Sequence, residues 1–172
     1  MSERASSRPA GLRPARRGAP KRVSVLGATG SVGQSTLDLI GRNPNLFKVV
    51  ALTARHNIER LAELAVRHGA ELAVIAEESQ YKALQERLAG TGIATAAGMP
   101  GLIEAALRPA DCVMAGIMGA AGLRPTLAAV SQGRRVALAN KECLVSAGEL
   151  FMEAVRRAGT ELIPVDSEHS AA

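Results

Sequence analysis

The 172-residue sequence contains no tryptophan, one tyrosine and two phenylalanines, although 47% of its residues are hydrophobic. Its core must therefore be built almost entirely from aliphatic side chains. Such a core suits buried parallel strands covered by helices better than a sandwich of two aromatic-rich sheets.

Cysteines and long apolar runs are also scarce. The two cysteines, Cys112 and Cys143, show neither metal-ligand spacing nor the pattern of a disulfide framework, so we expect a reducing, cytoplasmic environment. Cys143 has no histidine near it in the sequence and is expected to be a packing residue. No segment reaches the roughly 18 uninterrupted apolar residues of a membrane span, so no membrane partner is expected.

Acidic residues are nearly absent from the start of the chain. Residues 1–22 hold seven basic side chains and one acidic side chain, whereas residues 23–172 hold fourteen basic and fifteen acidic ones. Residues 1–21 are also rich in Pro, Gly and Ser and lack apolar periodicity, which predicts a disordered basic arm. An organelle transit peptide and nonspecific nucleic-acid contact are alternatives, but we favour a solvated extension without a nucleic-acid partner.

After the arm, short β-branched runs alternate with amphipathic stretches in six or seven strand–helix units. This alternation predicts an α/β fold with a Rossmann-like, doubly wound parallel sheet over residues 22–165. Ligands bind such sheets beyond the carboxyl ends of the strands. One helix is expected to begin after an Asn57 cap and to end before Gly69, and another to begin at a Ser79 cap.

The first predicted turn between a strand and a helix is rich in glycine. The segment GATGSVG places Gly27, Gly30 and Gly33 three residues apart. A bare backbone lets a pyrophosphate approach the first N–H groups of the helix, so we favour a dinucleotide-binding turn. The alternative is a turn that needs glycine only for packing of the strand against the helix.

The end of the second predicted strand indicates which dinucleotide is bound. A site that prefers NAD places Asp or Glu there to hold the ribose 2′-hydroxyl, but this chain carries Arg55 and His56. Because a guanidinium suits a 2′-phosphate, the sequence favours NADPH.

Two further segments follow predicted strands. Residues 115–122 are mostly Gly and Ala, which suits either a flat ligand lying on the backbone or close helix packing. Asn140, Lys141 and Glu142 then supply an amide, a cation and a carboxylate at the ligand-facing edge. The alternative for this triplet is a polar start to the next helix.

The last predicted strand runs into VDSEH. By the alternation of strand side chains, Asp166 and Glu168 point to the same side. Carboxylate oxygens are the ligands that Mg²⁺ or Mn²⁺ prefers, and Ser167 is placed to hydrogen-bond a substrate hydroxyl. A general acid–base pair is the alternative chemistry for the two carboxylates.

Four blocks occur together in one order: GATGSVGQSTLDLI, AGIMGAAGLRPTLAA, LANKECLVSAGELFM and PVDSEHSA. In combination they resemble the 1-deoxy-D-xylulose 5-phosphate reductoisomerase family, and the resemblance runs from about residue 22 to 171. It implies an NADPH- and divalent-metal-dependent enzyme of isoprenoid biosynthesis that forms 2-C-methyl-D-erythritol 4-phosphate. The runner-up is a non-catalytic NADP-binding module.

The resemblance also implies a role for each matching residue. The cofactor residues would be Thr29, Gly30, Ser31, Val32, Arg55, Asn57, Asn140 and Glu142. The metal would be bound by Asp166 and Glu168, the sugar phosphate by Lys141, Ser167 and Glu168, and the catalytic pair would be Lys141 and Glu168. Family members continue past this motif, so residues 166–172 would begin a catalytic domain truncated before its lid and C-terminal helical domain. The full-length enzyme would be a homodimer.

Overall fold

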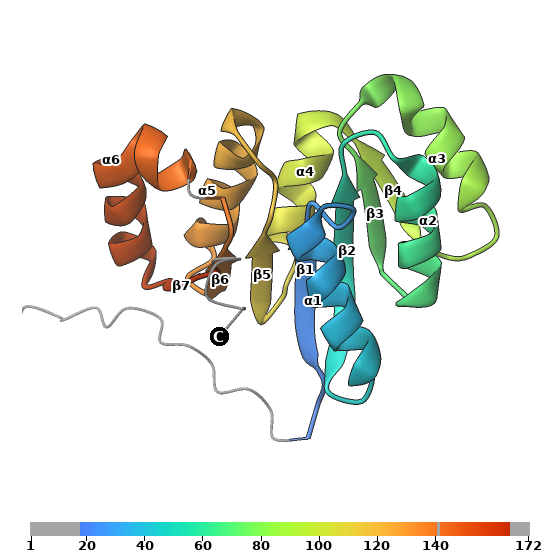
Figure 1. Cartoon of the computed structure of the whole chain (residues 1–172), viewed down its shortest axis with the longest axis horizontal. Coiled ribbons are helices and arrows are strands. Elements are labelled where there is room, and N and C mark those ends of the chain that lie inside the picture. Colours follow the sequence, from blue (N-terminus) through green and yellow to red (C-terminus); the bar gives the residue numbers. More distant parts are fainter. Residues whose placement is uncertain (1–17, 141, 166–172) are drawn as a thin grey trace, which may run out of the picture.

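The computed structural model describes residues 18–140 and 142–165, and it contains one seven-stranded parallel sheet (Figure 1). The strands are β1 (Lys21–Leu26), β2 (Phe47–Ala54), β3 (Leu72–Ile75), β4 (Ala94–Ala97), β5 (Cys112–Ala115), β6 (Arg135–Leu138) and β7 (Glu161–Pro164). They are hydrogen-bonded in the order β4-β3-β2-β1-β5-β6-β7. The predicted Rossmann-like, doubly wound sheet is therefore confirmed.

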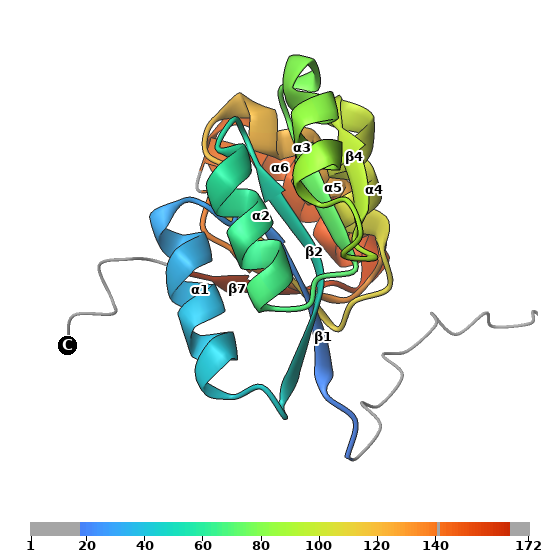
Figure 2. The ribbon, with the colours of Figure 1, turned by 90° about the vertical axis from the view of Figure 1, so that its right-hand side faces the viewer.

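Helices cover both faces of the sheet. The helical elements are α1 (Ser31–Arg42), α2 (Ile58–Arg67), η1 (Glu78–Gln80), α3 (Tyr81–Arg87), α4 (Gly98–Leu107), η2 (Ala120–Gly122), α5 (Leu123–Ser131) and α6 (Glu142–Ala158). Buried residues of α1 and α2 pack with one face, and those of α4, α5 and α6 with the other. Figure 2 shows α1 and α2 on one side of the sheet and α4 on the other.

Two aliphatic cores result from this layering. One is centred on side chains such as Val25, Leu52 and Leu61, and the other on Val50, Val113 and Phe151. The inner strands β2 and β3 carry nearly continuous buried runs because both of their faces are covered, whereas the edge strands β4 and β7 contain no buried residue. The scarcity of aromatic residues is thus consistent with the fold that it predicted.

Two predicted helix boundaries are confirmed and one is wrong. The Asn57 side chain accepts a hydrogen bond from the Arg60 N–H at 3.0 Å, and Gly69 follows α2 with a positive φ of 57°. Ser79, however, lies inside the short 3₁₀ helix η1 and does not cap α3, which begins two residues later. A tight 3₁₀ turn ahead of an α-helix leaves the sequence pattern nearly unchanged, so the pattern misplaces the start.

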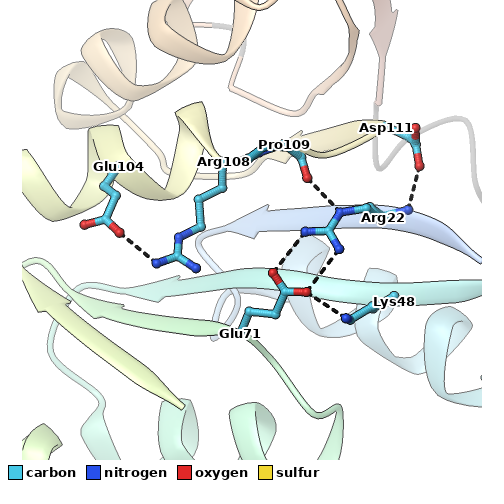
Figure 3. Close-up of polar contacts among 7 residues, drawn as sticks. All are labelled: Arg22, Lys48, Glu71, Glu104, Arg108, Pro109 and Asp111. Carbon is cyan, nitrogen blue, oxygen red and sulfur yellow. Dashed lines mark hydrogen bonds and ion pairs between the residues drawn. The ribbon is translucent and has the colours of Figure 1, made fainter. Parts of the chain in front are cut away.

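Polar side chains tie together the amino ends of four neighbouring strand segments (Figure 3). The Arg22 guanidinium donates to both Glu71 oxygens at 3.1 and 2.9 Å and to the Pro109 carbonyl at 2.9 Å. Lys48 lies 2.8 Å from Glu71, and Asp111 accepts the Arg22 N–H at 2.8 Å. We call these five residues the amino-edge clamp. The clamp lies at the amino ends of the strands, whereas a ligand is expected at their carboxyl ends.

The start of the folded domain differs slightly from the expected boundary. Lys21, assigned above to the basic arm, is the first residue of β1, and its N–H donates to the Leu46 carbonyl at 2.7 Å. Residues 1–17 lie outside the described part of the chain. Within the described part, no helix has the length and apolar character needed to cross a membrane.

Candidate cofactor site

A cavity of about 720 Å³ opens at the carboxyl ends of the central strands. It lies at the point where the order of the strands reverses: from β1 the sheet extends through β2, β3 and β4 on one side and through β5, β6 and β7 on the other. Its walls come from the loops after β1, β2, β3 and β5 and from one face of α4; the lining residues include Gly27, Thr29, Gly30, Thr53, Arg55, Glu77, Met99, Gly116, Ile117 and Ala121. A switch point of this kind is the usual ligand site of a doubly wound sheet.

The predicted glycine turn forms one wall of this cavity. Gly27 has a φ of 87°, and a Cβ added there would collide with the Gly116 carbonyl. Gly33 is already inside α1, where a Cβ would collide with the Gly27 carbonyl. The fold itself therefore requires glycine at both positions, and Gly27 in addition lines the cavity.

Gly30 differs from its neighbours in the turn. It is exposed, its φ of −77° is ordinary, and a Cβ there would meet only the Gly27 carbonyl, at 3.5 Å. It precedes α1, a twelve-residue helix that has neither a side-chain cap nor an acidic residue in its first turn. The protein itself does not need glycine here. An uncapped helix start behind a bare backbone fits the pyrophosphate of a dinucleotide.

The end of β2 lines the far side of the cavity. The Arg55 side chain is 83% exposed, and its Nε atom lies 3.8 Å from the Glu77 carboxylate, which ends the β3 loop. Asn57 is exposed two residues further on and caps α2. The guanidinium is thus free to turn towards a phosphate at the mouth of the cavity. No acidic residue occupies the end of β2, although Glu77 lies in the loop that follows the neighbouring strand β3.

The loop after β5 is braced by Asn140, which is fully buried. Its amide donates to the carbonyls of Ile117 and Gly119 at 2.6 and 3.1 Å, and its oxygen accepts the Glu142 N–H at 3.1 Å. Asn140 therefore fixes the shape of this wall of the cavity. A Cβ on Gly122 would collide with both Asn140 and the Ile117 carbonyl.

The small residues after β5 line the cavity at some positions and allow close packing at another. Gly116, Ala120 and Ala121 line the cavity, whereas Gly122 allows close packing against Asn140. Glu142 is partly exposed at the start of α6, beside this loop.

Lys141, Asp166, Ser167 and Glu168 lie outside the described residues, so their predicted roles stay predictions. Within residues 18–140 and 142–165, no group of three His, Cys, Asp or Glu side chains is arranged to hold a metal ion.

Sequence reasoning missed several lining residues. Thr53, Glu77, Met99 and Ile117 come from four different loops or elements, and only the fold brings them together.

Neither cysteine lines the cavity. Burial raises the pKa of Cys112 and of Cys143, which keeps both thiols protonated; for Cys143 this fits the expected role as a packing residue.

The sheet order, the switch-point cavity and the glycine turn define a Rossmann-like domain of the class that binds dinucleotides. Within this class, the model of the 1-deoxy-D-xylulose 5-phosphate reductoisomerase family matches residues 23–148. The chain therefore belongs to the 1-deoxy-D-xylulose 5-phosphate reductoisomerase family.

Individual relatives agree with this assignment. The reductoisomerase of Rhodospirillum centenum is 60% identical over 149 residues, which is 87% of this chain and 37% of the relative. The enzyme of Zymomonas mobilis is 57% identical; its structure in complex with NADPH superimposes with a TM-score of 0.86, covering 88% of this chain and 40% of that one. A reductoisomerase in complex with NADPH, fosmidomycin and magnesium gives a TM-score of 0.82 at 39% identity, over 88% of this chain and 38% of that one. The chain thus spans about two fifths of the length of these relatives.

Proposed function

We propose that this chain is the NADPH-binding part of a 1-deoxy-D-xylulose 5-phosphate reductoisomerase. The complete enzyme would use NADPH and Mg²⁺ or Mn²⁺ to convert its sugar phosphate substrate to 2-C-methyl-D-erythritol 4-phosphate. The cofactor supplies the hydride, and this domain holds and orients the cofactor. We assign residues 22–165 to cofactor binding and residues 166–172 to the start of the catalytic domain.

The observation that carries the proposal is the open space above Gly30. The protein leaves this backbone bare beside the uncapped start of α1, at the switch point of the sheet. The relative from Zymomonas mobilis that superimposes on the chain is itself a complex with NADPH. Arg55 at the same cavity favours a cofactor that carries a 2′-phosphate.

The other assignments follow from the same family membership. Thr29, Gly30, Ser31 and Val32 would hold the pyrophosphate and ribose of NADPH. Arg55 and Asn57 would lie near the adenosine phosphate, and Asn140 and Glu142 would contact the cofactor. Lys141, Ser167 and Glu168 would bind the substrate, Lys141 and Glu168 would act in catalysis, and Asp166 and Glu168 would bind the metal. We further propose a cytoplasmic location, a homodimer for the full-length enzyme, and neither a nucleic-acid nor a membrane partner.

Gly30→Ala tests the cofactor site directly. At the position before a helix, alanine is less favourable than glycine. The substitution should lower the free energy of unfolding by at most about 1 kcal/mol, so the variant should stay folded. The added methyl group would occupy space reserved for the pyrophosphate. We expect NADPH affinity, measured by fluorescence titration, to fall at least about tenfold, or about 1.4 kcal/mol.

Gly148→Ala is the matched control. A Cβ at Gly148 in α6 would meet no atom within 4 Å, so this change adds the same methyl group without affecting the cavity. NADPH affinity should stay at the level of the unmodified chain. No measurable NADPH binding by the unmodified chain would refute the proposed function. Equal binding by the chain and by Gly30→Ala would show that the cofactor lies elsewhere.

A further inference from the structure

Thr53 ties the end of β2 to the glycine turn after β1. Its side-chain oxygen accepts the Gly27 N–H at 2.8 Å, and its carbonyl accepts the Ala28 N–H at 2.7 Å. One residue of β2 thus binds the first two peptide groups of the turn. The Thr53 hydroxyl makes the first of these contacts, whereas any residue at this position can make the second.

The residue that Thr53 holds has little conformational freedom. Gly27 adopts a φ of 87° and packs against the Gly116 carbonyl so closely that no side chain fits. Its own carbonyl accepts the Gly30 N–H at 3.2 Å, which closes the turn. The position of Gly30, and with it the start of α1, therefore depends on where Gly27 is fixed.

We propose that Thr53 is a positioning residue whose hydroxyl fixes the dinucleotide-binding turn through Gly27. This inference rests on the proposed NADPH function. Thr53 lines the cavity, but its side chain is 0% exposed and its hydroxyl oxygen is occupied by the Gly27 N–H. Its effect on a ligand would therefore pass through the position of Gly27. Valine has the same shape but would leave the partly buried Gly27 N–H without its acceptor. The turn would then shift or loosen, and the pyrophosphate would lose its fitted backbone.

The test compares Thr53→Val with Thr53→Ser, which keeps the hydroxyl. Thr160→Val is the matched control, because the Thr160 hydroxyl is also buried and also bonds to the backbone, donating to the Val130 carbonyl. Neither Thr160 nor Val130 lines the cavity. NADPH affinity is measured by fluorescence titration and stability by thermal unfolding. Amide hydrogen exchange at Gly27, followed by NMR without cofactor, reports on the turn itself.

We expect Thr53→Val to weaken NADPH binding at least about fivefold and to speed amide exchange at Gly27 by a similar factor. A change of this size corresponds to the net free energy of about one hydrogen bond. Thr53→Ser should stay within about twofold of the unmodified chain in both measurements. Thr160→Val should lower the unfolding temperature while leaving affinity and Gly27 exchange unchanged.

Two results would overturn the inference. One is unchanged Gly27 exchange in Thr53→Val, and the other is equal NADPH affinity in Thr53→Val and the unmodified chain. Failure of the proposed function looks different, because the unmodified chain would then not bind NADPH at all. In that case Gly27 exchange still decides whether the hydroxyl fixes the turn.

Discussion

Arg55 is the residue on which preference for NADPH over NADH depends in our proposal. Its guanidinium lies at the cavity mouth and forms only a long, 3.8 Å ion pair with Glu77, in which the arginine is 83% and the glutamate 43% exposed. Exposed pairs of this kind contribute little stability, and a phosphate with about two negative charges competes well for the guanidinium. The pair therefore leaves Arg55 available to a 2′-phosphate.

Arg55→Ala should weaken NADPH binding about tenfold and leave NADH binding within about twofold, because NADH lacks the 2′-phosphate. Fluorescence titration with the two cofactors measures both affinities. Arg67→Ala is a suitable control, since Arg67 also forms a long surface pair, 3.7 Å from Glu63, but lies at the other end of α2. Equal weakening of NADPH and NADH would remove Arg55 from the phosphate site.

Single residues also show what sequence reasoning can reach. The glycine spacing predicts the turn because that signal is local, contained in seven consecutive residues. The roles of Thr53 and Asn140 stay hidden, since their partners lie 26 and 21–23 residues away along the chain. The burial of Asn140 adds a role that the sequence did not indicate, because its 0% exposed side chain supports a wall of the cavity.

At the scale of elements, the amino-edge clamp holds the strands whose opposite ends form the cavity (Figure 3). Glu71 is its centre, because it pairs with Arg22 of β1 and with Lys48 of β2. Hydrogen bonds from Arg22 and then from Lys48 hold the pKa of Glu71 below its ordinary value of 4.5. The folded state thus favours the ionised carboxylate more strongly than the unfolded chain does.

Glu71→Gln should therefore lower stability at neutral pH by about 1 kcal/mol, since the side chain is 30% exposed and solvent weakens the pairs. The contribution of Glu71 is present above pH 4.5 and is lost as the pH falls through the lowered pKa. Urea unfolding of the chain and the variant across this range should show the difference between them shrinking in acid.

Glu104→Gln provides the comparison for this experiment. Glu104 forms one exposed ion pair, at 2.9 Å, with Arg108 of the same helix segment and joins no strands. It should change stability by no more than about 0.5 kcal/mol. A difference between the chain and Glu71→Gln that stays constant down to the most acidic pH would show that the clamp does not depend on the Glu71 charge.

The sheet itself was only partly predictable from sequence. Alternating strands and helices predict parallel pairing, because each crossover returns the chain to the same edge. The order β4-β3-β2-β1-β5-β6-β7 depends on which buried faces fit one another, and no local pattern records that. Without the order, the neighbours of β1 are unknown, and so the contacts of Gly27 with Thr53 and Gly116 could not be foreseen.

At the scale of the whole molecule, the proposed reaction needs both a cofactor site and a metal-bound substrate site, and the described residues supply features of the first only. They contain the cavity, the glycine turn and Arg55, but within residues 18–140 and 142–165 no set of three ligands for a metal ion. The predicted metal ligands Asp166 and Glu168 would supply two carboxylates to an ion that takes about six oxygen ligands. The relatives with the complete activity are more than twice as long as this chain.

We therefore expect the 172-residue polypeptide alone to bind NADPH but not to oxidise it with 1-deoxy-D-xylulose 5-phosphate. Positioning two reactants accounts for roughly 7–11 kcal/mol of a barrier in favourable cases, so a site without the rest of the substrate pocket should turn over below detection. The measurement is NADPH absorbance with substrate and Mn²⁺, alongside a fluorescence titration of NADPH. Fusing the chain to the C-terminal three fifths of the Zymomonas mobilis relative should restore activity, and Asp166→Ala in that fusion should abolish it while NADPH still binds. Substrate-dependent oxidation by the 172 residues alone, lost in Asp166→Ala, would show instead that the chain carries a complete active site.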